Sequence, residues 1–233
     1  MEAIILAGGF GTRLRQVVTD VPKPMAPICG HPFLEILLRS LAKKGFSRVV
    51  LSLGYMAKKI SDHFGSRFAG LDLAYVVEET PLGTGGAIRL AFEACTQDHV
   101  FVFNGDTYLD LEAQFLERRW QAKRQPIIVA RQVLDTTRYG RLIVDGGRVT
   151  NFAEKGTEGP GLINSGCYVL TKDVLANFPL NHPFSIETDF LVPEVARASV
   201  EVFETLGVFI DIGVPEDYAR AQTLLADLLV HTE

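Results

Sequence analysis

Residues 3–14 read AIILAGGFGTRL, a short apolar run that passes directly into a glycine-rich turn. The apolar run predicts a strand buried on both faces, of the kind found at the centre of a parallel sheet. Glycine allows positive φ and leaves no Cβ between the backbone and a ligand, and N–H groups in such a turn can converge on an anion. Glycine turns often have no ligand, however, so this pattern alone leaves both phosphate binding and a plain loop open.

Two common phosphate-binding motifs do not fit this turn. The P-loop needs Gly-Lys-Ser/Thr after its second glycine, whereas Thr12 and Arg13 follow Gly11 here. The dinucleotide motif needs a third glycine three positions after Gly11 and an acid about 20 residues further on. Leu14 stands at the first of these positions, and Asp20 comes too early for the second. An oxidoreductase on a dinucleotide-binding fold is therefore disfavoured.

Length and composition favour one large α/β domain. The chain has 233 residues, of which 47% are hydrophobic, and a net charge of −5. This charge disfavours nucleic-acid binding by a basic surface, and no apolar run is long enough to span a membrane. Cys29, Cys95 and Cys167 are far apart, which predicts reduced thiols in a cytoplasmic protein without a disulfide framework or a cysteine metal site.

Strand and helix patterns alternate through the first half of the chain. Such alternation predicts a Rossmann-like, mostly parallel sheet with helices on both faces. In sheets of this kind ligands bind beyond the carboxyl ends of the strands. The segments are strands at 49–53, 71–77 and 99–103 and helices at 32–44, 56–64 and 87–95.

After residue 125 the pattern changes to short strands separated by turn signals. Strands are expected at 126–130, 141–144, 148–153 and 167–170, with Asp145-Gly146-Gly147 as a hairpin turn. We expect a small antiparallel substrate-binding lobe built onto the nucleotide half. The organisation predicted is a single domain over 1–233, divided into a nucleotide-binding half at 1–125 and a second half at 126–233.

Acidic residues stand at the ends of two predicted strands. Asp106 follows the strand at 99–103, and Asp211 follows an apolar run at 208–210. Carboxylates at a strand tip suit Mg²⁺, which takes one or two of them together with substrate phosphates. Two other interpretations stay open at this point, namely that Asp106 caps a helix predicted over 110–123 and that Asp211 is a solvated loop acid.

Two further segments complete the pattern. The glycine turn is followed by Pro22-Lys23-Pro24-Met25, and residues 78–87 read EETPLGTGGA. In the second segment Gly83, Gly85 and Gly86 would let a flat ligand lie against bare backbone, and Thr84 is a fair N-cap for the helix that follows.

Together these motifs resemble the sugar-1-phosphate nucleotidyltransferases, and the resemblance runs from Glu2 to about Leu225. It implies the nucleotide-diphospho-sugar transferase fold, Mg²⁺ as cofactor, and a nucleoside triphosphate and a sugar 1-phosphate as substrates. The products would be a nucleotide-sugar and pyrophosphate. Oligomeric state is not readable from the sequence, so a homo-oligomer stays open.

The resemblance also implies roles for individual residues. Arg13 would stabilise the departing pyrophosphate, Lys23 would contact the α-phosphate, and Asp106 and Asp211 would hold Mg²⁺. The remaining residues are implied to bind substrate: the sugar phosphate at Gly140, Glu154, Lys155 and Asn164, and the nucleotide at Leu6, Gly8, Gly9, Gly11, Thr12, Glu78, Pro81, Gly83, Thr84 and Asn104.

Within the family, the segments at 21–27 and 31–35 look most like guanylyltransferases for D-glycero-D-manno-heptose 1-phosphate in bacterial surface-polysaccharide synthesis. Mannose-1-phosphate guanylyltransferases and N-acetylmuramate-1-phosphate uridylyltransferases are alternatives. The Glu78 carboxylate could accept hydrogen bonds from the N1–H and N2–H₂ edge of guanine. A regulatory module that binds nucleotide-sugars without turnover is a further alternative, which the joint presence of Arg13, Lys23, Asp106 and Asp211 disfavours.

Overall fold

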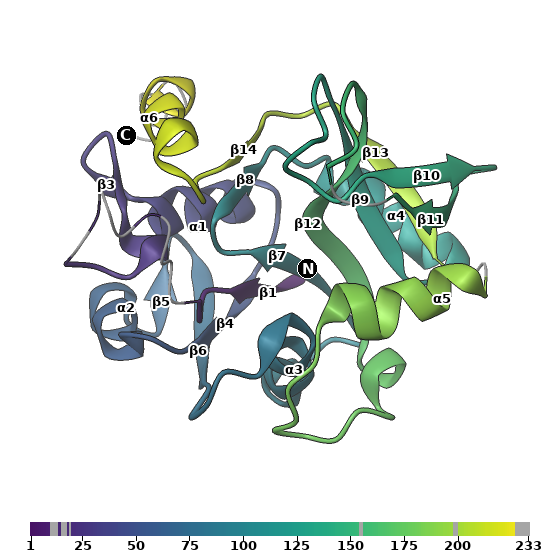
Figure 1. The fold of residues 1–233 in the computed structure, drawn as a ribbon. Helices are drawn as coiled ribbons and strands as arrows, with labels where there is room; N and C mark the ends of the chain where they lie inside the picture. The colour runs from purple at the N-terminus through teal and green to yellow at the C-terminus, as the bar shows by residue number, and fades with distance from the viewer. Residues whose placement is uncertain (10–13, 15–17, 19, 154–155, 198–199, 227–233) are drawn as a thin grey trace.

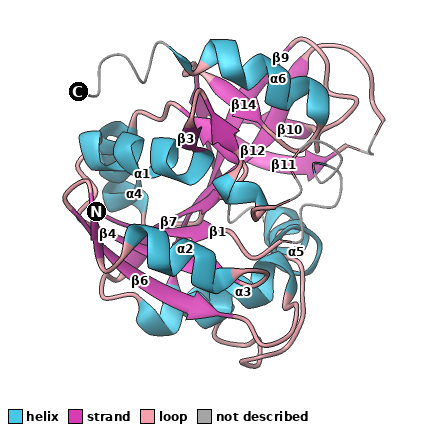
Figure 2. Cartoon of the chain, turned by 90° about the vertical axis from the view of Figure 1, so that its left-hand side faces the viewer, coloured by secondary structure: helices cyan, strands magenta, loops and turns pink. Residues whose placement is uncertain are grey.

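The protein is seen here in a computed structural model that describes all residues except 10–13, 15–17, 19, 154–155, 198–199 and 227–233. A ten-stranded sheet crosses the molecule, in the order β10-β11-β13-β9-β12-β7-β1-β4-β6-β5. Helices cover both faces of this sheet (Figure 1, Figure 2). Its strands are β1 (Glu2–Leu6), β4 (Arg48–Leu53), β5 (Arg67–Phe68), β6 (Leu71–Val77), β7 (His99–Asn104), β9 (Ile127–Val133), β10 (Leu142–Asp145), β11 (Arg148–Phe152), β12 (Gly161–Thr171) and β13 (Glu201–Thr205).

Two short ribbons and several helices complete the described structure. The ribbons pair β2 (Pro27–Ile28) with β3 (His31–Pro32), and β8 (Thr107–Leu109) with β14 (Phe209–Asp211). The α-helices are α1 (Phe33–Lys43), α2 (Ala57–Phe64), α3 (Gly83–Ala91), α4 (Ala113–Lys123), α5 (Val192–Ala196) and α6 (Pro215–Leu224). The other helical turns are η2 (Lys23–Met25), η3 (Phe92–Ala94), η4 (Lys172–Leu175) and the π-helical turn η5 (Ile186–Leu191).

The parallel centre of the sheet confirms the predicted fold class. Strands β7, β1, β4 and β6 lie side by side and all run in the same direction. In register, Leu6 at the end of β1 faces Ser52 of β4 on one side and Asn104 of β7 on the other. The carboxyl ends of these strands therefore meet at one edge of the sheet, as parallel pairing requires.

The core forms on both faces of the sheet because side chains alternate along each strand. In β1, Ala3 and Ile5 point into a cluster with α1, α2, α4 and α6, whereas Ile4 points into a cluster with α3, η5 and α5. All three side chains are fully buried. The continuous apolar run at the start of the chain is thus explained by burial on two sides.

The second half of the chain continues the same sheet. Strand β12 pairs antiparallel with β7 on one side and β9 on the other, and the β10–β11 hairpin lies at the far edge. Sequence patterning predicts only the end of β12, because its register shifts between Asn164 and Cys167. Gly166 in this bulge has a φ of +72°. The bulge breaks the alternation of side chains that identifies a strand in a sequence.

The start of α3 differs from the sequence prediction. Thr84 does not cap the helix; α3 begins at Gly83 after Leu82, which has no side-chain cap of its own. The Glu78 carboxylate instead accepts a hydrogen bond from the Leu82 N–H at 2.9 Å. The hydroxyl of Thr84 is directed elsewhere and donates to Glu187.

A buried carboxylate on β13 gives a test of stability. The Glu201 side chain is 1% exposed and pairs with Lys123 at 2.8 Å, Arg119 at 3.2 Å and Arg148 at 3.4 Å. Burial alone would raise the pKa of Glu201, but hydrogen bonds from Lys123 and Arg119 outweigh it and hold that pKa below its usual value. Because the folded-state pKa is lowered, this stabilisation is present above the unfolded carboxyl pKa and is lost as the pH falls through the folded value.

We therefore expect Glu201→Gln to lower the free energy of unfolding at neutral pH by about 1–3 kcal/mol. The deficit relative to wild type should shrink in acid, below a pH of about 4. Thermal melts of both proteins across this pH range measure the effect. Glu204→Gln, on an exposed position of the same strand, is the matched control. An equal deficit at every pH would show that the ion pairs are not its source.

Among the described residues, no helix combines the length and the apolar character needed to cross a membrane.

Candidate active site

A cavity of about 600 Å³ opens at the carboxyl edge of the parallel strands. Its walls come from the segments that follow β1, β4, β6 and β7, which is where a sheet of this topology binds ligands. The structure brings these predicted site residues together around it: Leu6, Gly8, Gly9, Lys23, Glu78, Pro81, Gly83, Thr84, Asn104 and Asp106. The predicted residues Gly11, Thr12, Arg13, Glu154 and Lys155 lie outside the described residues.

Gly8 lets three loops meet below the cavity. A Cβ on Gly8 would lie 2.9 Å from Glu78 Oε1 and 3.2 Å from the backbone nitrogen of Gly54. No described atom would lie within 4 Å of a Cβ on Gly9, which lines the cavity. The first glycine therefore permits close packing of backbone segments, and the second leaves open space for a ligand.

The glycines of α3 serve a different purpose from the one that the sequence indicates. A Cβ on Gly85 would overlap the ring of Phe184, and one on Gly86 would lie 2.6 Å from the His182 carbonyl oxygen. The expectation that a flat ligand lies against these two positions is therefore wrong. They admit the chain segment before η5, whereas Gly83 does line the cavity.

An ion pair lies in the cavity wall. Lys23 Nζ, on the turn η2, is 2.5 Å from Asp106 Oδ2, and the lysine side chain is only 11% exposed. The alternative that Asp106 caps α4 is wrong, because the residue at that cap is Glu112. Asp106 stands instead at the end of β7, immediately before β8.

The β8–β14 ribbon brings the second predicted acid to the same place. Asp211 pairs with Thr107 across this ribbon, and the Ile212 N–H donates to the Asp106 carbonyl at 2.9 Å. The Asp211 carboxylate accepts from the Gly213 N–H at 2.5 Å. A Cβ on Gly213 would lie 2.7 Å from Asp211 Oδ1 and 3.2 Å from Lys23 Nζ. Lys23 and Asp211 thus lie beside Gly213, and Asp106 joins them through its ion pair with Lys23.

This donor set fits Mg²⁺ in the form in which the ion accompanies phosphates. Such an ion takes one or two carboxylates and completes its shell with water and substrate oxygens. Asp106 and Asp211 supply two carboxylates at adjacent backbone positions. Within the described part of the chain, no three His, Cys, Asp or Glu side chains are grouped so as to hold a metal by themselves.

Glu78 is held in place by the protein itself. Its Oε2 accepts from the Leu82 N–H at 2.9 Å, and its Oε1 accepts from the hydroxyl of Ser52, which is fully buried, at 3.3 Å. A carboxylate has about four acceptor sites, so these two bonds leave capacity for a ligand. The acid that the sequence predicts as a base contact is therefore fixed in orientation at the cavity.

The predicted sugar-phosphate residues Gly140 and Asn164 lie together on the second half. The Asn164 N–H donates to the Gly140 carbonyl at 3.0 Å. Neither residue lines the cavity itself, but the bulge of β12 touches its wall, since a Cβ on Gly166 would overlap the side chain of Asn104.

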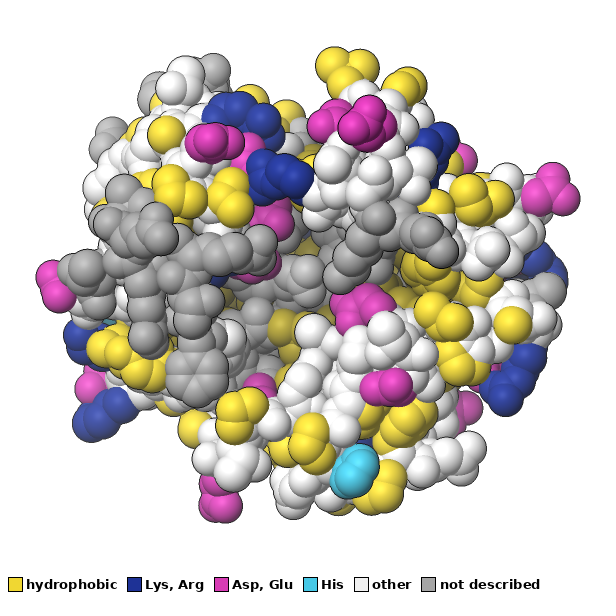
Figure 3. Space-filling view, viewed as in Figure 1, with side chains coloured by type: hydrophobic (Ala, Val, Ile, Leu, Met, Phe, Trp, Pro, Cys, Tyr) yellow, Lys and Arg dark blue, Asp and Glu magenta, His cyan; other side chains and the backbone are white. Residues whose placement is uncertain are grey.

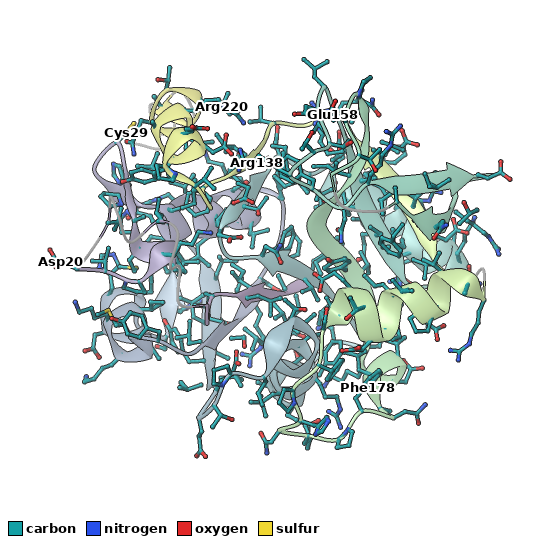
Figure 4. All side chains as sticks on the ribbon, viewed as in Figure 1. Asp20, Cys29, Arg138, Glu158, Phe178 and Arg220 are labelled. Carbon is teal, nitrogen blue, oxygen red and sulfur yellow. The ribbon has the colours of Figure 1, made fainter. Side chains whose placement is uncertain are left out.

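Arg138 links the segment between β9 and β10 to α6. It lies between α6 and the strands β9 and β12 in Figure 4, and its Nη1 is 2.7 Å from Asp217 Oδ2 on α6. The space-filling view shows basic and acidic side chains next to one another where α6 faces these strands (Figure 3).

Some residues of the cavity are absent from the sequence-based prediction. Gly54 and Tyr55 follow β4, and Gly213 follows Asp211. The rule that ligands gather beyond strand ends would have indicated the first two. Gly213 is found only through the β8–β14 pairing.

The fold and this site define an α/β protein with a ligand-sized cavity at the carboxyl edge of its parallel strands. A family model described as nucleotidyl transferase matches residues 2–227, and the chain belongs to that family. The family predicted from the sequence motifs is thereby confirmed.

Several characterised proteins are similar over nearly the whole chain. The D-glycero-alpha-D-manno-heptose 1-phosphate guanylyltransferase of Aneurinibacillus thermoaerophilus is 43% identical over 224 residues, which is 95% of this chain and 97% of that protein. HddC from Yersinia pseudotuberculosis, solved in complex with GMP-PN, is 40% identical with a TM-score of 0.84 over 95% of this chain and 97% of that one. A mannose-1-phosphate guanylyltransferase of Mycobacterium tuberculosis is 35% identical over 98% of this chain and 65% of that protein.

Proposed function

We propose that this nucleotidyltransferase joins GTP to D-glycero-D-manno-heptose 1-phosphate, giving a GDP-sugar and pyrophosphate. The observation that carries the chemistry is the gathering of Lys23, Asp106 and Asp211 beside the cavity. The choice of base and sugar is supported by the heptose guanylyltransferase that is 43% identical over almost the full length of both chains. A cytoplasmic location and a role in surface-polysaccharide synthesis belong to the same proposal, as does a division of labour between residues 1–125 and 126–233.

The proposed reaction needs charge neutralisation more than proton transfer. A phosphate monoester has a second pKa of about 6, so the sugar 1-phosphate is already an anionic nucleophile near neutral pH. Its approach to the α-phosphate of GTP is opposed by repulsion between anions. Catalysis therefore depends on in-line positioning and on cations placed at the phosphates. In this proposal Lys23 contacts the α-phosphate, and Arg13 stabilises the charge on the departing pyrophosphate.

Asp106 and Asp211 would hold the Mg²⁺, which when bound neutralises phosphate charge. Lys23 pairs with one of these acids, Asp106. This ion pair keeps the lysine at the cavity wall. In the same proposal Lys155 contacts the sugar phosphate, and Gly140, Glu154 and Asn164 contact the sugar.

Glu78 gives a test of base recognition. Glu78→Gln replaces one acceptor oxygen by an NH₂ donor, which would face the N–H groups of guanine. We expect kcat/KM for GTP to fall by about 10- to 100-fold, because a hydrogen bond to a charged group is lost and two donors then face one another. Kinetics with GTP and UTP measure the change in preference. Glu79→Gln is the matched control, since Glu79 also lines the cavity. Equal losses for both nucleotides would argue against a contact between Glu78 and guanine.

A second candidate is supported by the mannose-1-phosphate guanylyltransferase that is 35% identical over 98% of this chain. It differs from the first only in the sugar. An N-acetylmuramate-1-phosphate uridylyltransferase and a regulatory module without turnover complete the set of alternatives.

One assay separates these candidates. Pyrophosphate release is measured with Mg²⁺ for GTP, UTP, CTP, ATP and dTTP against heptose, mannose, glucose and N-acetylmuramate 1-phosphates. The proposal expects activity with GTP and the heptose. Activity with mannose 1-phosphate alone would support the second candidate. Binding of GTP without turnover of any sugar would support the regulatory module, and absence of nucleotide binding would contradict all of these functions.

A further inference from the structure

Glu187 joins the two sides of the substrate site, although neither the motifs nor the proposed chemistry includes it. It belongs to the π-helical turn η5, between β12 and α5. Its carboxylate accepts three hydrogen bonds from hydroxyl groups. Thr84 and Ser185 donate to Oε2 at 2.8 and 2.9 Å, and Tyr168 donates to Oε1 at 3.3 Å. Helical segments of the π type occur frequently at functional sites.

The hydrogen bond between Glu187 and Thr84 reaches the nucleotide side of the site. Thr84 lines the cavity, and its hydroxyl accepts a hydrogen bond from the Ile186 N–H at 3.0 Å while it donates to Glu187. The N–H groups of Gly85 and Gly86 donate to the Phe184 carbonyl at 3.0 and 3.3 Å. The loop at 78–87 is therefore attached to η5 by side-chain and backbone bonds together.

The hydrogen bond between Glu187 and Tyr168 leads to the sugar side of the site. Tyr168, which is 1% exposed, accepts a hydrogen bond from Asn164 Nδ2 at 2.8 Å. Asn164 Oδ1 in turn accepts from the Gly166 N–H at 3.1 Å, in the bulge that touches Asn104. The orientation of the Asn164 amide is thus set by Tyr168 on one side and by the bulge on the other.

The direction of the central bond follows from the environment of the phenol. Burial, and next the charge of Glu187, raise the pKa of Tyr168 well above its usual value, so the hydroxyl keeps its proton at neutral pH. It donates that proton to the carboxylate and accepts from Asn164. Of the bonds that Glu187 accepts, those from Thr84 and Ser185, at 2.8 and 2.9 Å, are shorter than the bond from Tyr168 at 3.3 Å.

We propose that Glu187 is a positioning residue that couples the nucleotide side of the site to the sugar-phosphate side through Thr84 and Tyr168. The inference rests on the nucleotidyl transfer proposed above. When a substrate binds on one side of the site and orders the side chains there, the Glu187 carboxylate would transmit that ordering to the other side. One unbroken series of hydrogen bonds runs from the β12 bulge to the cavity wall, through Asn164, Tyr168, Glu187 and Thr84.

Two single variants and their combination test this coupling. Tyr168→Phe breaks the link between Glu187 and Asn164. KM for the sugar 1-phosphate, and KM for GTP measured with the sugar 1-phosphate saturating, should therefore each rise about fivefold, because coupling between two sites is reciprocal. Glu187→Gln weakens the hydrogen bonds to both Thr84 and Tyr168, so KM for GTP and KM for the sugar 1-phosphate should both rise. The double variant should be no worse than Glu187→Gln, because the two residues act through one series of bonds. Glu194→Gln, an acid on the adjacent α5 that pairs with Arg197, is the matched control and should behave as wild type.

Outcomes that contradict the inference are distinct from those that contradict the proposed function. Kinetic constants unchanged in both variants, whether or not the melting temperature falls, would show a purely structural role and would overturn it. Multiplicative losses in the double variant would overturn it as well. Equilibrium binding of GTP in EDTA needs no sugar turnover: Glu187→Gln should bind about fivefold more weakly and Tyr168→Phe as wild type. Equal GTP binding by the wild type and Glu187→Gln would refute the coupling. Absence of sugar 1-phosphate turnover by the wild type would refute the transferase proposal, whatever the variants do.

Discussion

Asp106→Asn is expected to lower kcat for nucleotidyl transfer by about a thousandfold, the size of effect seen when a preorganised charge at a reacting centre is removed. Asp106 has three partners at the site. Its carboxylate holds Lys23 Nζ at 2.5 Å and accepts a hydrogen bond from the Thr107 hydroxyl at 3.3 Å, and its backbone carbonyl accepts from Ile212, beside Asp211. The amide keeps the size of the side chain but removes the negative charge that both Lys23 and a bound Mg²⁺ require. Pyrophosphate release under saturating substrates measures the loss.

The chain offers a matched control for this substitution. Asp110 pairs with Lys44 at 2.5 Å, the same separation as in the Lys23–Asp106 pair, and it does not line the cavity. Asp110→Asn should therefore keep the activity of the wild type. If both variants lose activity in proportion to their loss of thermal stability, the effect of Asp106→Asn comes from the fold and not from the site.

Lys23→Met is expected to lower kcat by about 100- to 1000-fold, because an immobile cation at the phosphates is lost. The methionine retains most of the apolar stem of Lys23, a side chain that is mostly buried on the turn η2. Because Lys23 is proposed to act on charge that develops in the transition state, the loss should appear mainly in kcat and less in KM for GTP. Steady-state kinetics with each substrate varied in turn separates the two constants.

Lys44→Met serves as the control, since it breaks the corresponding ion pair outside the cavity. It should leave both constants near their wild-type values. A rise in KM for GTP with kcat unchanged in Lys23→Met would mean that this lysine contributes ground-state binding only, which would contradict its proposed role at the α-phosphate.

The sequence by itself determined the parallel centre of the fold. The strands expected at 49–53 and 71–77 correspond to β4 and β6, and the helix expected over 32–44 is α1, followed by Gly45 with a φ of +88°. These elements are predictable because their signals are local. A strand buried on both faces must be apolar throughout, and a helix that packs on it must place apolar residues three and four apart. The motifs on the connecting loops were sufficient to identify the family, which the match over residues 2–227 confirms.

Tertiary structure decided how the second half meets the first. Pairing of β12 with β7 adds the later strands to the same sheet, and the bulge at Asn164–Cys167 hides that strand from any pattern of alternation. The cap of α3 likewise depends on Glu78, which precedes the helix and reaches Leu82 through its side chain. Neither feature follows from propensity, because each depends on a partner that the fold supplies.

The site shows the same division most clearly. Strand ends identify Asp106 and Asp211, and the family motif identifies Lys23, one by one as candidates. Their meeting, and the series of bonds through Glu187 from the β12 bulge to Thr84, exist only once the sheet has closed. The physical reason is the separation along the chain over which each kind of interaction acts. Burial patterns and turn chemistry act over a few residues and are written in the sequence, whereas contacts between residues some hundred positions apart are set by the pairing of strands and the packing of helices upon them.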